Sequence, residues 1–355
     1  MKIKKNKKKN NQIIKELKID DRVEITPKKD AYITIKDHKQ RFPDEIKCRL
    51  INPCKPNIGK VSKIFLDNIN KKIKTLLNLR QLKNSYETIE WFNSLNNKTR
   101  LQFIQFDIVD FYPSVTDDLL KETIEFATEH ITLDPIEIET IKNSRLSILH
   151  HDNKVWTKKN GLFDITMGSY DGAQVTDLVG LYILYLLKKE IPEIDFGLYR
   201  DDGLGIHRRI PATKLNMIKK KIKAIFERLG LKITMETNLT NVNFLDVTFN
   251  LHNESYHPFR KPNDNPIYIH TSSNHPPHVK KNLPTAINKR LSDLSTNEKM
   301  FNENKEIYQN ALRKGNHNHK LKYNMKNQKE PQNINVKKKT ETGSKFGSPL
   351  LTTHH

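Results

Sequence analysis

Apolar side chains recur along the chain with two periods, one typical of amphipathic helices and one of buried strands. In the segment 58–77 they return every three to four residues, at Ile58, Val61 and Ile64, which predicts a helix. The largely apolar run LQFIQFDIV, residues 101–109, predicts a buried strand instead. Similar helical spacing predicts further helices over 117–131, 134–149, 171–189, 211–229 and within 276–315.

Shorter apolar stretches bounded by turn residues predict antiparallel strands. LYRDDGLGI, within 196–206, predicts a hairpin with Asp202 and Gly203 at its turn, because Asp-Gly favours tight turns. Further strands are predicted in 31–39, over 231–235, and in a hairpin formed by 243–251 and 255–260. Strands and helices mixed in this order favour an α+β domain built on an antiparallel sheet.

The chain is strongly basic, and most of the excess charge lies at its two ends. Its 355 residues carry a formal net charge of +21, which favours a polyanionic partner such as nucleic acid. Residues 1–20 hold eight lysines against two acids, and 313–355 hold ten Lys or Arg against two acids. The tails 1–20 and 316–355 are rich in Lys and Asn and are predicted to be disordered. The charge supports a nucleic-acid partner without establishing one.

Cysteine, histidine and apolar content argue against several other classes. The two cysteines form neither a disulfide framework nor a zinc spacing. His275 and His278 lack further ligands nearby, and HNH at 317–319 lies in a predicted disordered tail, so neither predicts a metal site. The longest apolar run, Leu178–Leu187, is too short to cross a bilayer, and no apolar segment follows the basic N-terminus as a secretory signal requires. An intracellular protein, nuclear or cytoplasmic, is expected.

Three aspartates stand at predicted strand ends. Asp107 follows an apolar run, and Asp201 and Asp202 lie at the hairpin. Taken alone, Asp107 is explained as a strand cap, and Asp201 with Asp202 is explained as part of a turn. Together they could hold two divalent cations, for which Mg²⁺, or Mn²⁺ in its place, suits hard oxygen ligands. Arg200 is expected to point away from them, toward the opposite face of its strand.

The order of these motifs resembles that of reverse transcriptases. FDIVDFYPS is similar to their motif A and YRDD to their motif C, and MGSYDGA stands between them in the place of motif B. FERLGLKIT and NFLDV are similar to motifs D and E, and IKDHK and CRLINP resemble the fingers motifs. FRKPN and SNHPPHVKK resemble the segment after the primer grip in Penelope-like retroelement polymerases. The resemblance covers about 31–312.

This resemblance implies a right-hand polymerase with fingers, an antiparallel-sheet palm and a small helical thumb. The implied parts are fingers over 21–100, a palm over 101–255 with an insertion around 117–160, and a basic thumb-like segment over 256–315.

The resemblance also implies roles at the metal site and beside it. Asp107 and Asp201 would be the principal metal ligands and Asp202 the third carboxylate. Tyr112 stands where the family carries its aromatic steric gate, whose ring collides with a ribose 2′-OH. A preference for deoxynucleotides is therefore expected.

Basic and glycine residues are implied to contact the nucleotide. Arg49 matches the fingers arginine that binds the incoming triphosphate, for which a planar guanidinium is well suited. Lys36 or Lys39 could act similarly. Gly168 would let the backbone approach the nascent base pair closely.

Other positions have two interpretations. Lys232 is either the lysine that protonates pyrophosphate or a solvated residue at a strand start. Phe244 and Leu245 either position the primer or belong to the core. The motif B segment departs from the family, because Met167 replaces a glutamine and Asp171 adds an acid, which leaves template contacts open.

The expected function is that of an RNA-directed DNA polymerase of a retroelement. Its partners would be an RNA template, a DNA or RNA primer and deoxynucleoside triphosphates. One alternative is an inactive nucleic-acid-binding derivative, against which the intact aspartates and Tyr112 argue. Another is an RNA-directed RNA polymerase, a class that usually carries glycine where Arg200 stands.

Overall fold

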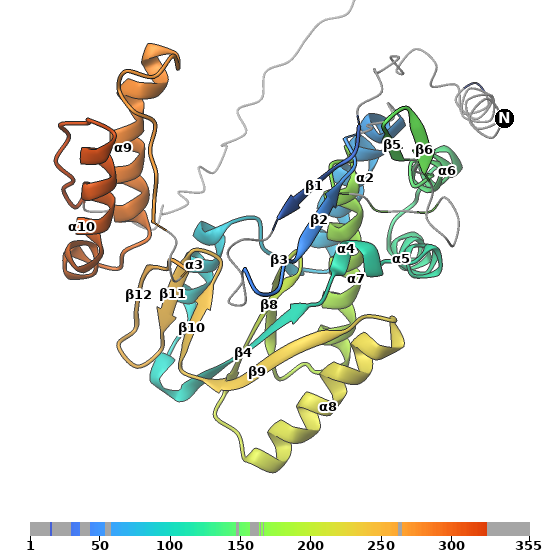
Figure 1. Ribbon diagram of the computed structural model, residues 1–355. Coiled ribbons are helices and arrows are strands. Elements are labelled where there is room, and N and C mark those ends of the chain that lie inside the picture. Colours follow the sequence, from blue (N-terminus) through green and yellow to red (C-terminus); the bar gives the residue numbers. More distant parts are fainter. Residues whose placement is uncertain are drawn as a thin grey trace, which may run out of the picture.

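The structure is a computed structural model. It describes residues 30–35, 43–53, 58–146, 149–156, 163, 165, 167–261 and 265–324, together with Lys15 (Figure 1). Its helices and mainly antiparallel sheets confirm the predicted α+β class. Within these ranges, no helix combines the length and the apolar character needed to cross a bilayer.

A five-stranded sheet forms the centre of the fold (Figure 1). In spatial order its strands are β3 (Arg80–Gln81), β7 (Asp195–Tyr199), β8 (Asp202–Arg208), β4 (Leu101–Ile108) and β9 (Ile233–Leu239). β3 and β7 run parallel, whereas the other neighbours are antiparallel. The predicted buried strand β4 is thus held on both sides, by β8 and by β9.

Helices cover one face of this sheet. The apolar helix α7 (Gly172–Glu190) packs against β7 and also contacts α8 (Ala212–Arg228), α2 (Ile58–Leu76) and α5 (Asp117–His130). α6 (Pro135–Asn143) packs on α2. Because α7 is surrounded by other elements, it is apolar on almost every side, as its sequence predicts.

The side chains of β4 alternate between two apolar clusters. Ile104 and Phe106 join the larger cluster with α7 and α8, whereas Phe103 joins a second cluster on the opposite face. Since alternate residues of a strand share a face, Asp107 lies on the Phe103 side, away from the helices.

A smaller antiparallel sheet packs on that second face. It consists of β10 (Asn241–Phe244), β11 (Val247–Asn250) and β12 (Ser255–Pro258), and it shares the second cluster with α3 (Ser85–Ser94). Asp107 remains exposed at the far end of β4.

Two hairpins and one short helix complete the described body. β1 (Tyr32–Ile35) pairs with β2 (Cys48–Ile51), and β5 (Leu149–His151) pairs with β6 (Lys154–Trp156). The four-residue helix α4 (Phe111–Ser114) follows β4 directly.

The C-terminal helices α9 (Pro277–Asp293) and α10 (Glu298–Lys314) build a core of their own, on the side of the molecule away from α5 and α6 (Figure 1). Its buried members are Ile287, Leu291, Phe301, Leu312 and Leu321. Because Leu321 is buried and the Lys322 amide donates to Asn288, the prediction of disorder from residue 316 is wrong for 316–324.

Two predicted boundaries are also wrong. The helix predicted over 134–149 ends at Asn143, because the next two residues turn inward to form buried polar contacts. The strand predicted over 243–251 is divided into β10 and β11 by a turn at Leu245, whose φ is 55°. The predicted hairpin is therefore a three-stranded sheet.

Candidate active site

The two aspartate motifs meet at one end of the central sheet. β4 and β8 pair so that Asp107 lies opposite Asp202. The backbone N–H of Ile108 donates to the carbonyl of Asp201 at 2.9 Å, and the next N–H donates to the carbonyl of Lys232 at 2.8 Å. These bonds tie the end of β4 to both neighbouring chain segments and hold the two motifs side by side.

The turn of the hairpin is not where the Asp-Gly signal predicts it. Tyr199 pairs with Asp202, so Arg200 and Asp201 form a two-residue turn and Gly203 lies inside β8. Arg200 has a φ of 53°, in the left-handed region that two-residue hairpin turns require. Asp201 therefore stands at the tip, and Asp202 is the first residue of the returning strand.

Gly203 is required by packing against a neighbouring strand. A Cβ at this position would lie 2.0 Å from the ring of Phe106, which belongs to the main core. The glycine of the motif therefore leaves room for the aromatic ring of Phe106 to pack against β8.

A cavity of about 840 Å³ opens beside the carboxylates. Asp107 and Asp201 both line it, together with the predicted gate Tyr112 and the predicted triphosphate-binding Arg49. Gly168, from the loop before α7, lines it as well. The structure thus brings together five predicted site residues from four separate segments of the chain.

Asp202 differs from the other two aspartates. It is half-buried and is not among the described residues that line the cavity. Burial, followed by the negative charges of Asp201 and Asp107, raises the pKa of its carboxyl to about 6, against the opposing effect of Lys261. The three carboxylates are therefore close enough to repel one another.

The donor set fits Mg²⁺ in a site that substrate would complete. Among the described residues, no three His, Cys, Asp or Glu side chains form a preformed metal cage. Asp107 and Asp201 nevertheless present two carboxylates to one cavity. Mg²⁺ is usually held in this way, by one or two carboxylates plus waters and substrate phosphates.

Tyr112 is held by the arginine of the hairpin tip. Its phenol oxygen accepts a hydrogen bond from Nη1 of Arg200 at 2.7 Å. The expectation that Arg200 points away from the carboxylates stays a prediction, because its guanidinium contacts Tyr112 and interacts with Asp177 on α7, and Arg200 is not among the described residues that line the cavity. No local signal predicts this contact, since its partners come from different motifs.

The remaining nucleotide-contact predictions lie on β2 and the loop before α7. Arg49 is exposed on β2. Gly168 has a φ of 108°, and a Cβ there would lie 2.6 Å from the carbonyl oxygen of Asn52. In the structure, Gly168 therefore lets the loop before α7 approach the end of β2 closely. Lys36 and Lys39 lie outside the described residues.

Three other predicted residues lie near the site or behind it. Lys232 is exposed just before β9, and only its carbonyl takes part in the contact with β4. Phe244 is buried in the second apolar cluster, and Leu245 forms the turn beside it. Of the two interpretations of Phe244, primer positioning or core, its burial agrees with the core.

Asp171 does not add an exposed acid to the motif B segment. It is fully buried, forms an ion pair with Arg145, and accepts a hydrogen bond from the Ser144 hydroxyl at 2.7 Å. Both side chains of the pair are 1% exposed. The contact attaches the end of α6 to the start of α7, and sequence reasoning missed Arg145.

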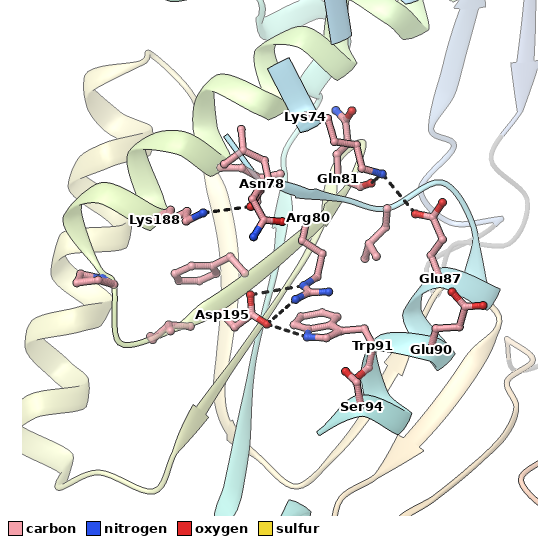
Figure 2. A pocket seen from close by; sticks show the side chains of 16 residues that line it. Lys74, Asn78, Arg80, Gln81, Glu87, Glu90, Trp91, Ser94, Lys188 and Asp195 are labelled. Carbon is pink, nitrogen blue, oxygen red and sulfur yellow. Dashed lines mark hydrogen bonds and ion pairs between the residues drawn. The ribbon is translucent and has the colours of Figure 1, made fainter. Parts of the chain in front are cut away.

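A second hollow, of about 610 Å³, lies at the opposite end of β7 (Figure 2). Asp195 accepts hydrogen bonds there from Arg80 at 3.0 Å and from the indole of Trp91 at 2.9 Å. Lys74 and Lys188 donate to backbone carbonyls at its rim. Because these charged groups bind one another or the backbone, the hollow does not offer the converging carboxylates of the first cavity.

The C-terminal helices match a known family. Residues 267–326 match the model of the animal helix-turn-helix domain, which agrees with the helical prediction for this basic segment. No curated protein matches the sequence significantly.

Much of the chain is similar to solved polymerase structures. A telomerase from Candida albicans, in complex with a fragment of telomeric RNA, aligns at 14% identity and a TM-score of 0.52, over 72% of this chain and 46% of that chain. An apo telomerase from Candida tropicalis aligns at 11% identity and a TM-score of 0.46, over 82% and 59%. The RNA-dependent RNA polymerase of a human picobirnavirus aligns at 12% identity and a TM-score of 0.42, over 61% and 40%.

The first of these alignments shows a shared fold. It spans less than half of the telomerase chain. The other two TM-scores are too low to define a fold by themselves.

Proposed function

We propose that the protein is an RNA-directed DNA polymerase of a retroelement, of the Penelope-like type, which adds deoxynucleotides to a primer 3′-OH. The observation that carries the proposal is the joint placement of Asp107, Asp201, Tyr112 and Arg49 around one cavity. The fold shared with the telomerase chain supports it. The parts of the chain would act as fingers, palm and thumb.

Asp107 and Asp201 would hold Mg²⁺, with Asp202 as the third carboxylate and Mn²⁺ as a possible substitute. Two such ions, when bound, activate the attacking hydroxyl and neutralise charge on the leaving phosphate oxygens. The protein's own contribution is rigid placement, because backbone hydrogen bonds fix the end of β4 against the hairpin tip. Repulsion among the carboxylates, visible in the raised pKa of Asp202, favours binding of cations.

The other cavity residues would orient the nucleotide. Arg49 would bind the triphosphate through its planar guanidinium, with Lys36 or Lys39 assisting. The ring of Tyr112 would exclude a ribose 2′-OH. Gly168, which has no side chain, would let the nascent base pair approach the backbone closely. Lys232, which is exposed just before β9, would donate a proton to departing pyrophosphate.

The primer would run along the small sheet and the C-terminal helices. Leu245 is placed at the turn of β10 and β11 by the buried Phe244 and would support the primer end. The basic segment of α9 and α10 would contact phosphates of the template–primer duplex. Binding should therefore weaken steeply as salt concentration rises.

The test is extension of one primer on an RNA template and on a DNA template of the same sequence. Each template is supplied with Mg²⁺ and either deoxy- or ribonucleotides. We expect deoxynucleotide addition on RNA, lost when Mg²⁺ is chelated. Preferential ribonucleotide addition would assign an RNA-directed RNA polymerase, and duplex binding without extension would assign an inactive derivative.

A further inference from the structure

Arg200 occupies an unusual place for an arginine. It stands at the tip of the β7–β8 hairpin, between Tyr199 and the metal-ligand candidate Asp201, in a left-handed conformation. Its guanidinium is half-buried and donates to the phenol oxygen of Tyr112 at 2.7 Å. A hairpin turn alone requires only a small residue such as Gly, Asn or Asp at this position, so turn chemistry does not explain the arginine.

Other groups hold the guanidinium in place. Its central carbon lies 5.9 Å from the centre of the Tyr199 ring, within cation–π range. Asp177, on α7, interacts with it electrostatically, and the charge of Arg200 opposes the rise that burial causes in the pKa of that carboxyl. The arginine thus lies near the Tyr199 ring and interacts with the charge of Asp177 while it donates to Tyr112.

Tyr112 needs such an anchor. It stands on α4, which is only four residues long and begins after Asp110, itself in the left-handed region with a φ of 47°. The side chain of Tyr112 is partly exposed to the cavity. The ring packs against the main core, and the hydrogen bond at the phenol oxygen fixes its far end.

We propose that Arg200 is a positioning residue for sugar selection, which holds the Tyr112 ring where it excludes a ribose 2′-OH. The inference rests on the proposed polymerase function and deepens it. It explains why the gate is a tyrosine, since phenylalanine would supply the same bulk without the anchored end. It also links Tyr112 to the hairpin that carries Asp201. One turn would therefore place both the ring that meets the sugar and a carboxylate that would hold the metal.

The test measures sugar discrimination in the full-length protein. The quantity is the ratio of kcat/KM for a deoxynucleotide to that for the matching ribonucleotide on a primed RNA template. The ratio cancels differences in the amount of active enzyme, so a purely structural loss leaves it unchanged. The variants are Arg200→Ala, Arg200→Lys, Tyr112→Phe and the double variant Arg200→Ala with Tyr112→Phe.

Arg200→Ala and Tyr112→Phe should each lower the ratio about tenfold, which corresponds to about 1.4 kcal/mol, the scale of a hydrogen bond to a charged group. The double variant should be no worse than either single variant, because both remove the same contact. Arg200→Lys should recover part of the ratio. Arg208→Ala, which removes an exposed cation from the other end of β8, should leave it unchanged.

Four results would overturn the inference, and they differ in whether the gate or the polymerase assignment falls with it. A ratio in Arg200→Ala within twofold of the wild type, or additive effects in the double variant, refutes the role of Arg200 alone. Equal use of both sugars by the wild type refutes the gate while the polymerase assignment stands. If the wild type extends the primer with neither sugar, the proposed function fails and the inference fails with it.

Discussion

Replacing Asp202 by asparagine should stabilise the protein in the absence of divalent cations. In the folded protein the pKa of Asp202 rises from 3.8 to about 6, first through burial and then through repulsion from Asp201 and Asp107. Each pKa unit corresponds to about 1.4 kcal/mol, so the ionised carboxylate destabilises the fold by at most about 3 kcal/mol. Solvent screening of a partly exposed group reduces this to about 1–2 kcal/mol. Asparagine keeps the shape and removes the charge.

The sign of the pH dependence follows from the direction of the shift. Because the folded pKa of Asp202 lies above the unfolded one, the folded state binds the extra proton between about pH 4 and pH 6. The wild type therefore loses stability as pH rises through that window, and Asp202→Asn does not. The difference in unfolding free energy should be largest above pH 6 and vanish below pH 4.

The assay is urea unfolding with chelator present, at pH 4.5, 6 and 7.5. Asp118→Asn is the matched control, because the Asp118 side chain is 94% exposed and its change should stay within about 0.5 kcal/mol. A destabilised Asp202→Asn at pH 7.5, or a gain that does not depend on pH, would refute the picture of three crowded carboxylates.

Three further changes test the packing around the site. Gly203→Ala should cost about 2 kcal/mol or more in urea unfolding, because its Cβ would collide with the Phe106 ring; a cost below 0.5 kcal/mol would show that the strands separate freely. Asp171→Asn should cost about 3–5 kcal/mol by leaving Arg145 charged and buried, and an unchanged midpoint would contradict the buried ion pair. Asp246→Ala should make the C-terminal helices more sensitive to limited proteolysis, since this carboxylate binds both α3 and α9, and an unchanged cleavage pattern would show that other contacts hold them.

Periodicity predicted most of the elements that build the site. The helices over 58–77, 117–131 and 171–189 and the strand over 101–109 lie where their apolar spacing places them, because each buries one face or all faces in the main core. The order of the aspartate motifs also predicted that Asp107 and the hairpin would meet. These features depend on side-chain patterns within one segment.

The errors arise where distant contacts override local signals. Asp202-Gly203 looks like a turn, but the pairing register places the turn two residues earlier, at Arg200 and Asp201. Phe106, from β4, determines the need for glycine. The helix expected to reach residue 149 ends at Asn143 because Arg145 binds Asp171 across the fold. Sequence spacing carries no information on such partners.

The contact of Arg200 with Tyr112 belongs to the same class. Each residue stands in a motif whose pattern is explained without the other, and 88 positions separate them. The left-handed turn at the hairpin tip puts the arginine within hydrogen-bond distance of Tyr112.

The most direct test of the account compares primer extension by the wild type and by Asp201→Asn, with Asp118→Asn as the control. All three are measured with deoxynucleotides and Mg²⁺ on a primed RNA template. We expect extension by the wild type and the control and none by Asp201→Asn, because one of the two carboxylates that face the cavity is lost. Full activity of Asp201→Asn would contradict the assignment of this hairpin tip as a metal ligand.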